Sequence, residues 1–171
     1  MEGLFDYEPG TKEEYLEKIV EGKANLRVIS FSKDPSNLLL WAHYADGFHG
    51  ICIEVEIDPN GFIDYEEIIY SPFRTIFSDR SSQEIENWPR YILRGKNESW
   101  YYEKEVRVFS RDKFVNTGIR ITAIHIGIRT PKVMVETLYR LSNGRFPIYL
   151  TKISETSNCI EVSNEVTQAQ Q

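Results

Sequence analysis

The sequence predicts an α+β fold in which helices flank a mixed, mainly antiparallel sheet. Segments that alternate apolar and polar residues, the pattern of half-buried strands, recur along the chain. Helical patterns with recognisable start and stop signals lie between them, and no internal repeat or linker interrupts the pattern. We therefore expect a single domain over residues 1–162 and a polar C-terminal tail over residues 163–171.

Composition and charge narrow the classes of function. The 171 residues are 41% hydrophobic and 13% aromatic, which is typical of a folded globular protein. The formal net charge of -6 argues against tight, nonspecific binding to nucleic acid. Residues 74–96 are locally basic with interleaved aromatic residues, but a solvated helix face is the better interpretation of this segment.

Cysteine spacing and hydropathy exclude several kinds of site. Cys52 and Cys159 form neither a metal-binding spacing nor a disulfide framework, and Cys52 lies in an apolar run typical of a buried thiol. We expect no metal site, because His43 and His49 lack the spacing that one helix face would present. No stretch resembles a membrane span or a signal peptide, so we expect no membrane association and a cytoplasmic location.

The N-terminal elements are predicted from caps and alternation. A Thr-x-x-Glu capping box starts a helix over residues 11–22, which Gly22 ends. Residues 25–32 (N-L-R-V-I-S-F-S) alternate as a strand that places Ser30 and Ser32 on one face.

A second helix is predicted over residues 37–45, with Ser36 as its N-cap. Its sequence is apolar nearly all round, a pattern that indicates a buried helix. His43 lies inside this run, where a hydrogen-bonded core histidine is more common than a ligand.

The clearest strand is predicted over residues 50–57 (G-I-C-I-E-V-E-I). Its isoleucines and valine alternate with Cys52, Glu54 and Glu56, and the two glutamates are interpreted as a wet strand face. Residues 62–70 continue in extended form, and Pro89 interrupts or starts a helix in the following segment.

Residues 100–109 (W-Y-Y-E-K-E-V-R-V-F) predict the strand around which the fold is organised. Glu103, Glu105 and Arg107 would share one face of it. Like-charged neighbours on one face repel, and Arg107 supplies a compensating bidentate partner. The stretch indicates either an edge strand with surface ion pairs or a polar site with two carboxylates in a cleft.

The remaining elements follow the same signals. A buried strand is predicted over residues 119–128, and a helix that begins at Thr130-Pro131 and runs to about Leu141. Strands over residues 146–153 and 159–162 complete the pattern. The chain carries no phosphate-binding loop, dinucleotide fingerprint, nucleophile elbow or paired C-x-x-C, so the sequence does not support phosphoryl transfer, Rossmann redox chemistry or serine hydrolase chemistry.

Two sequence blocks, W-A-H-Y-A with a following glycine and W-Y-Y-E-K-E-V-R after a lysine, occur in that order. Together they resemble a bacterial and phage family defined only as a domain of unknown function, over about residues 27–153. The matching positions are Trp41, His43, Tyr44, Ala45 and Gly50, then Lys96, Trp100, Glu103, Glu105 and Arg107.

A Ser-x-Ser strand, an apolar strand and a Glu-x-Glu followed by valine also occur in order, at residues 30–32, 51–57 and 103–106. This order resembles ADP-ribosyltransferases of the arginine-serine-glutamate class, and it implies NAD as a substrate with no tightly bound cofactor. The resemblance implies that Glu105 stabilises the positive charge that builds on the ribose as nicotinamide leaves. Glu103 would orient an acceptor.

The same resemblance implies the residues that bind NAD. Ser30 would hold the strand and the nicotinamide side, and Trp41, His43 or Tyr44 would stack on or bond the dinucleotide. Ser32 and Arg107 complete the implied binding set. The resemblance further implies a toxin, a phage-defence factor or a counter-defence factor.

A second hypothesis is a non-catalytic module that holds a small molecule, a nucleotide or a protein partner in the same cleft. The transferase class binds the dinucleotide phosphates through an arginine on a strand that precedes the Ser-x-Ser strand. Arg27 shares the strand of Ser30 instead, which motivates this alternative.

Overall fold

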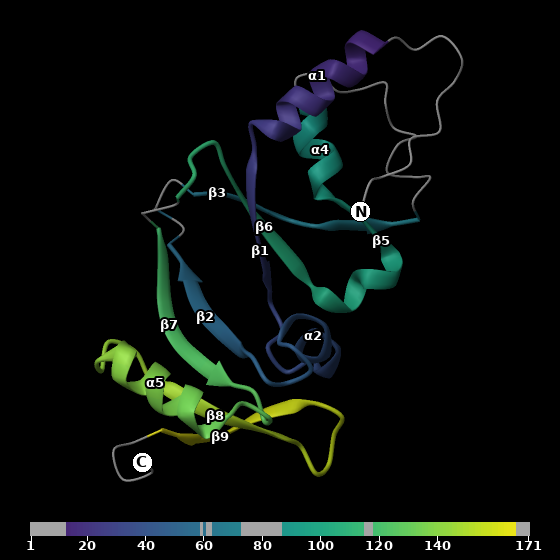
Figure 1. The fold of residues 1–171 in the computed structure, drawn as a ribbon. Coiled ribbons are helices and arrows are strands. Elements are labelled where there is room, and N and C mark those ends of the chain that lie inside the picture. Colours follow the sequence, from purple (N-terminus) through teal and green to yellow (C-terminus); the bar gives the residue numbers. More distant parts are fainter. Residues whose placement is uncertain (1–12, 59, 61–62, 73–86, 115–117, 167–171) are drawn as a thin grey trace.

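The computed structural model describes residues 13–58, 60, 63–72, 87–114 and 118–166. The α+β prediction is confirmed, and antiparallel pairing predominates among the strands. The strands are divided between two main sheets and a small parallel pair, which joins β4 (Ile69–Ser71) to β5 (Gly95–Asn97). Figure 1 shows the two main sheets one above the other, with α1 and α4 beyond the upper one.

The first sheet carries the predicted Ser-x-Ser strand. Its order is β1-β6-β3, from β1 (Arg27–Ser32), β6 (Glu105–Ser110) and β3 (Asp64–Glu67), and both pairings are antiparallel. In this register Ser30 lies opposite Arg107 and Ser32 lies opposite Glu105. The sheet therefore brings serines and charged residues that are more than 70 positions apart in the sequence to adjacent positions.

The second sheet has the order β2-β7-β8-β9. It is formed by β2 (Ile51–Ile57), β7 (Ile119–Ile126), β8 (Ile148–Ile153) and β9 (Ile160–Glu165). The β7–β8 pair is parallel and the other two pairs are antiparallel. Its core holds Ile124, Ile126 and Ile148, against which α5 (Lys132–Ser142) packs.

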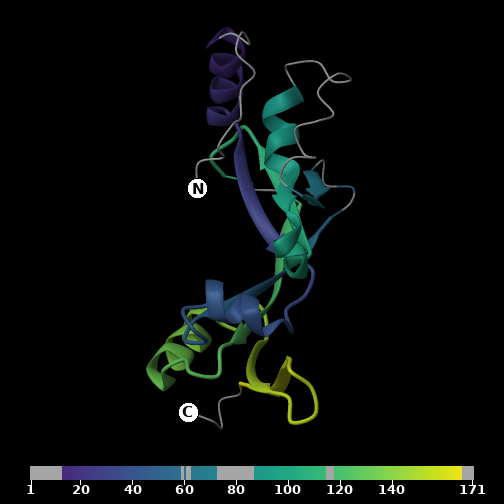
Figure 2. The ribbon, with the colours of Figure 1, turned by 90° about the vertical axis from the view of Figure 1, so that its right-hand side faces the viewer.

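Two of the helices pack against each other, and a third contacts both main sheets. The helices α1 (Glu13–Ala24) and α4 (Trp88–Arg94) lie side by side in Figures 1 and 2, and a Cβ added to Gly22 would clash with Pro89. The helix α2 (Leu38–Tyr44) packs Trp41 onto the second sheet and also reaches the segment before β6. It therefore links the two sheets.

The predicted strand over residues 100–109 is wrong in its first half. Glu98–Glu103 forms a 3-10 helix, which begins where the Asn97 side chain accepts a hydrogen bond from the Ser99 N–H at 2.9 Å. Lys104 follows in the left-handed conformation with φ 45°, and the strand starts only at Glu105. A turn of the chain, and not strand alternation, therefore sets the relation between the two glutamates.

The predictions for α2 also need correction. Its N-cap is Asn37, because the Ser36 hydroxyl donates to Asp34 Oδ1 at 2.6 Å instead. The helix is amphipathic, since Trp41 is 3% exposed whereas Tyr44 is 66% exposed. His43 is exposed as well, so its interpretation as a core histidine is wrong.

The C-terminal tail predicted over residues 163–171 is wrong in its first part. Residues 163–165 belong to β9, and the buried Val166 packs into the core of the second sheet. The capping box that begins at Thr11 and the basic residues Arg74 and Arg80 lie outside the described residues.

Candidate active site

A cleft with a volume of about 980 Å³ lies between the two main sheets. Its volume is near the upper end of the ~300–1,000 Å³ that is typical of small-molecule sites. One wall comes from β1, the start of β6 and Lys96, and the other comes from β2. The helix α2 closes one end through Leu40, Trp41 and Tyr44.

Seven of the eight predicted site residues line this cleft. They are Ser30, Ser32, Trp41, Tyr44, Glu103, Glu105 and Arg107. His43 is not among them, and its ring instead lies on the exposed side of α2, 6.1 Å from the Trp100 ring. Trp41 is almost fully buried and donates its indole N–H to the Pro35 carbonyl at 2.7 Å, so it anchors α2 and does not offer a stacking surface.

Glu105 is the most heavily bonded carboxylate of the cleft. Arg107 donates Nε to Oε1 at 2.7 Å and Nη2 to Oε2 at 3.2 Å, and Lys96 Nζ lies 3.0 Å from Oε2. Burial raises the pKa of Glu105, but hydrogen bonds from Arg107, Ser30 and Lys96 outweigh it and hold the pKa below the ordinary value. The side chain is therefore an ionised carboxylate although only 6% of it is exposed.

Glu103 and Glu105 share one cationic partner, Lys96. Lys96 Nζ forms an ion pair with Glu103 Oε2 as well as with Glu105, and the Tyr44 hydroxyl donates to Glu103 Oε1 at 2.7 Å. Burial, together with the adjacent Glu103 carboxylate, raises the pKa of Tyr44 to about 12. Tyr44 therefore stays a neutral hydrogen-bond donor at physiological pH.

Lys96 is a site residue that the sequence interpretation did not assign. Burial lowers the pKa of its ammonium, but hydrogen bonds to Glu103 and Glu105 outweigh this and raise it. The ammonium also lies 5.2 Å from the centre of the Trp100 ring. The available signal was the lysine that precedes the second sequence block, seven residues before Glu103.

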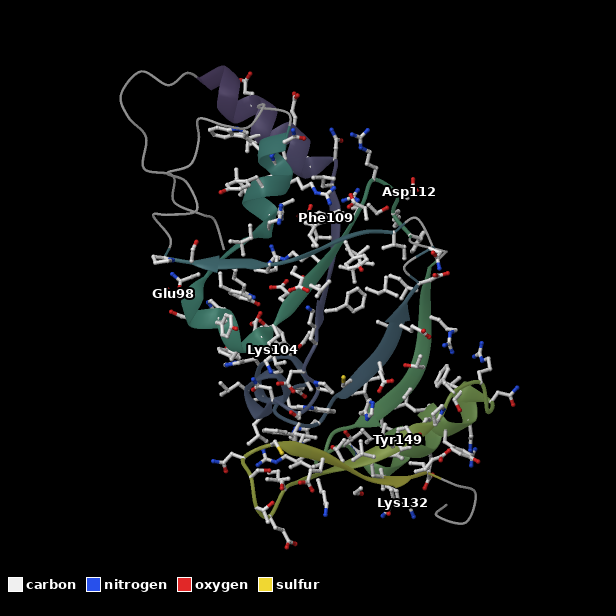
Figure 3. All side chains as sticks on the ribbon, turned by 180° about the vertical axis from the view of Figure 1, so that it is seen from behind. Glu98, Lys104, Phe109, Asp112, Lys132 and Tyr149 are labelled. Atoms are coloured by element: carbon white, nitrogen blue, oxygen red, sulfur yellow. The ribbon has the colours of Figure 1, made fainter. Side chains whose placement is uncertain are left out.

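Hydrogen bonds with Ser32 and Tyr70 hold the backbone of the two glutamates. Ser32 Oγ donates to the Glu103 backbone carbonyl at 2.7 Å and accepts from the Asp34 N–H at 3.0 Å. The Tyr70 hydroxyl accepts from the Glu105 N–H at 2.8 Å. Figure 3 shows Lys104, the residue between the two glutamates, at the end of β6 that lies beside α2.

The β2 wall carries a third carboxylate, Glu54, for which the sequence predicted only a wet strand face. Thr122 Oγ1 donates to Glu54 Oε1 at 2.8 Å, and His125 Nε2 lies 2.8 Å from Oε2. These two hydrogen bonds lower the pKa of Glu54. His125 is buried and stacks on Tyr149, which Figure 3 labels in the second sheet.

The remaining charged residues near the cleft form ion pairs. Lys33, on the cleft lining, pairs with Glu67, and Lys104 Nζ lies 2.8 Å from Asp34 Oδ2. In the basic segment, Arg90 and Arg94 both pair with Glu66. These two arginines therefore bind partners within the fold.

Comparisons of the chain with protein-family models, curated proteins and solved structures found no match. Within the described ranges, no group of three or more metal-ligating side chains is placed to hold a metal ion. None of the described helices has the length and apolar character needed to span a membrane.

Proposed function

We propose that the protein cleaves the bond between nicotinamide and ribose in NAD, as an ADP-ribosyltransferase-like enzyme. The observation that carries the proposal is the convergence of Ser30, Glu103 and Glu105 on one wall of a cleft of suitable size. The order of the sequence motifs implied these three residues. The β1–β6 pairing brings Ser30 close to Glu105, and Lys96 links Glu105 to Glu103.

The state of Glu105 fits the chemistry. Loss of nicotinamide builds positive charge on the ribose, and a fixed, ionised carboxylate stabilises that charge best when little water surrounds it. Glu105 is buried, ionised and held by Arg107, Lys96 and Ser30. In the proposal it faces the ribose, and Glu103 orients the acceptor through the carboxylate oxygen that Tyr44 holds.

Lys33 is proposed to bind the dinucleotide phosphates. It lines the cleft, and its ion pair with Glu67 joins two exposed side chains. An exposed pair of this kind contributes only about 0–1 kcal/mol, so a phosphate can replace the carboxylate at little cost. This role is the one that the transferase class gives to an arginine on an earlier strand. In a cytoplasmic setting such an enzyme would act as a toxin, a phage-defence factor or a counter-defence factor.

The test is nicotinamide release from NAD, with and without a cell lysate as a source of acceptors. We expect release by the native chain and a loss of about 100-fold or more for Glu105→Gln. The matched control is Glu56→Gln, which removes an exposed glutamate that pairs with Arg120 outside the cleft. Thermal unfolding of each variant separates lost chemistry from lost folding. No release by the native chain, or equal release by Glu105→Gln, rejects the proposal.

A second candidate function is a non-catalytic binding module. The observation in its favour is that each oxygen of Glu103 and Glu105 already has a partner among Tyr44, Lys96 and Arg107. Carboxylates bonded in this way shape a pocket without reacting. This function predicts that a nucleotide raises the melting temperature in proportion to the logarithm of its concentration without turnover. An unchanged melting temperature with NAD, nucleotides and lysate fractions rejects it.

A further inference from the structure

The charges on the cleft lining do not balance. Four carboxylates but only three lysine or arginine side chains line it. An unbalanced charge in a concave site is felt more strongly than one on a flat surface, because the walls exclude part of the water that would screen it. The acidic residues are Asp34, Glu54, Glu103 and Glu105, and the basic residues are Lys33, Lys96 and Arg107.

The imbalance lies at Glu54. Glu103 and Glu105 share Lys96, and Asp34 contacts Lys104. The two hydrogen bonds to Glu54 come from Thr122 and His125, and no lysine or arginine among the described residues contacts it. Each of these two groups donates one hydrogen to the carboxylate, and the His125 contact is an ion pair only when the imidazole is protonated. Glu54 is therefore oriented by its neighbours without being neutralised by a lysine or an arginine.

The geometry leaves this carboxylate available to a ligand. Each oxygen of Glu54 has one donor, so each keeps acceptor capacity. The side chain is 51% exposed and lines the cleft, whereas His125 behind it is 8% exposed. The stack of His125 on Tyr149, with ring centres 5.6 Å apart, fixes the imidazole that orients the carboxylate. The arrangement is a fixed acceptor that faces the cavity.

We propose that Glu54, oriented by Thr122 and His125, forms a subsite for a cationic nitrogen group of a ligand, either a primary ammonium or a guanidinium. Such a group donates several hydrogens and supplies the positive charge that the cleft lining lacks. The subsite lies on the wall opposite Glu105. The inference goes beyond the proposed function, because it holds whether the cleft cleaves NAD or only binds a ligand.

The test uses the full chain and three small probes of equal chain length, butylamine, butylguanidine and butanol, at pH 7 and fixed ionic strength. Chemical shifts of glutamate carboxyl carbons report binding. We expect one of the two cations to bind and to shift the Glu54 signal, and butanol to leave it unchanged. Glu54→Gln should raise the Kd for that cation by about fivefold or more. The cation that binds more tightly shows whether the subsite prefers a primary ammonium or a guanidinium.

The control is Glu56→Gln, which removes the same charge two residues away and outside the cleft lining. We expect it to leave cation binding unchanged, because Glu56 does not line the cleft. If the cations were held only by the net negative charge of the chain, both variants would weaken binding equally. Equal binding by the native chain and Glu54→Gln, an equal loss in Glu56→Gln, or equal binding of butanol overturns the subsite. Nicotinamide release is not part of this readout, so failure of the subsite and failure of NAD cleavage are distinguishable.

Discussion

The two walls of the cleft hold their carboxylates in different electrostatic states. On the wall formed by β1 and β6, Glu103 and Glu105 lie against Lys96 and Arg107, and the four side chains are mostly buried. On the β2 wall, Glu54 is half exposed and is oriented by hydrogen bonds from Thr122 and His125. The charges of the first wall pair with one another and are mostly buried, whereas the second wall leaves the carboxylate of Glu54 half exposed.

The difference has an energetic basis. Removal of one partner from a buried ion pair leaves an uncompensated charge at low dielectric, which destabilises a protein far more than loss of an exposed pair. Removal of a charge from the first wall should therefore lower the free energy of unfolding more than removal of a charge from the second wall.

Arg107→Ala should have the largest effect on folding. It leaves the buried Glu105 with Lys96 as its remaining cation and also removes a hydrogen bond to the Leu93 carbonyl. We expect a loss of about 3–5 kcal/mol in the free energy of unfolding, measured by urea denaturation. The matched control Arg120→Ala removes an exposed pair with Glu56 and should cost less than about 1 kcal/mol. Similar losses in both variants would contradict the structural role of the buried pair between Arg107 and Glu105.

The acid dependence of stability should depend on Glu105. Its pKa is lowered in the folded state from the ordinary value of 4.5, so its contribution is complete above that value and is lost as the pH falls through the lower, folded-state pKa. Glu105→Gln should be less stable at neutral pH and should lose less further stability below about pH 4.5 than the native chain. Unfolding curves at a series of pH values check this, and parallel curves for the two proteins would contradict it.

Lys33→Ala tests the proposed contact between Lys33 and the dinucleotide phosphates. Its ion pair with Glu67 is exposed, so unfolding free energy should change by less than about 1 kcal/mol. Loss of a phosphate contact worth about 1.4 kcal/mol should raise KM for NAD about tenfold, with kcat unchanged. Steady-state kinetics check the split. An unchanged KM would remove Lys33 from the phosphate site.

Glu54→Gln should have the smallest effect on stability. The amide keeps an acceptor oxygen for one of the two donors, and the side chain is half exposed. We expect a change of less than about 1 kcal/mol in the unfolding free energy. A loss comparable to that of Arg107→Ala would show that the carboxylate of the β2 wall is also structural.

Local patterns predicted the strand of Ser30 and Ser32 and the pairing of Glu105 with Arg107, because alternation and charge attraction act between near neighbours. They did not predict that Lys96 compensates Glu103. They did not predict the 3-10 helix before Glu105, because that turn depends on the Asn97 cap and on a left-handed lysine. Glu103 and Glu105 nevertheless lie close enough to share Lys96, because the turn brings the two carboxylates together in place of strand alternation.

The missed site residues depend on contacts between distant elements. Lys96 reaches the glutamates from β5, which the β4–β5 pairing and the 3-10 helix position. Glu54 alternates with apolar residues along β2, as any residue on a solvated strand face does. It lines a cleft because the first sheet lies opposite β2, and the sequence of β2 does not show this. His43 was misplaced because an apolar sequence all round predicted a buried helix, whereas Trp41 and Ala45 alone are buried there.

The most direct test of the division between the walls is a carboxyl-carbon NMR titration of the full chain with NAD and, separately, with the cation that binds. The division between the walls predicts that NAD shifts the Glu105 and Glu103 signals, and that the cation shifts the Glu54 signal and leaves the Glu105 signal unchanged. Equal shifts of all three carboxylates with either ligand, or no shift with both, would contradict it.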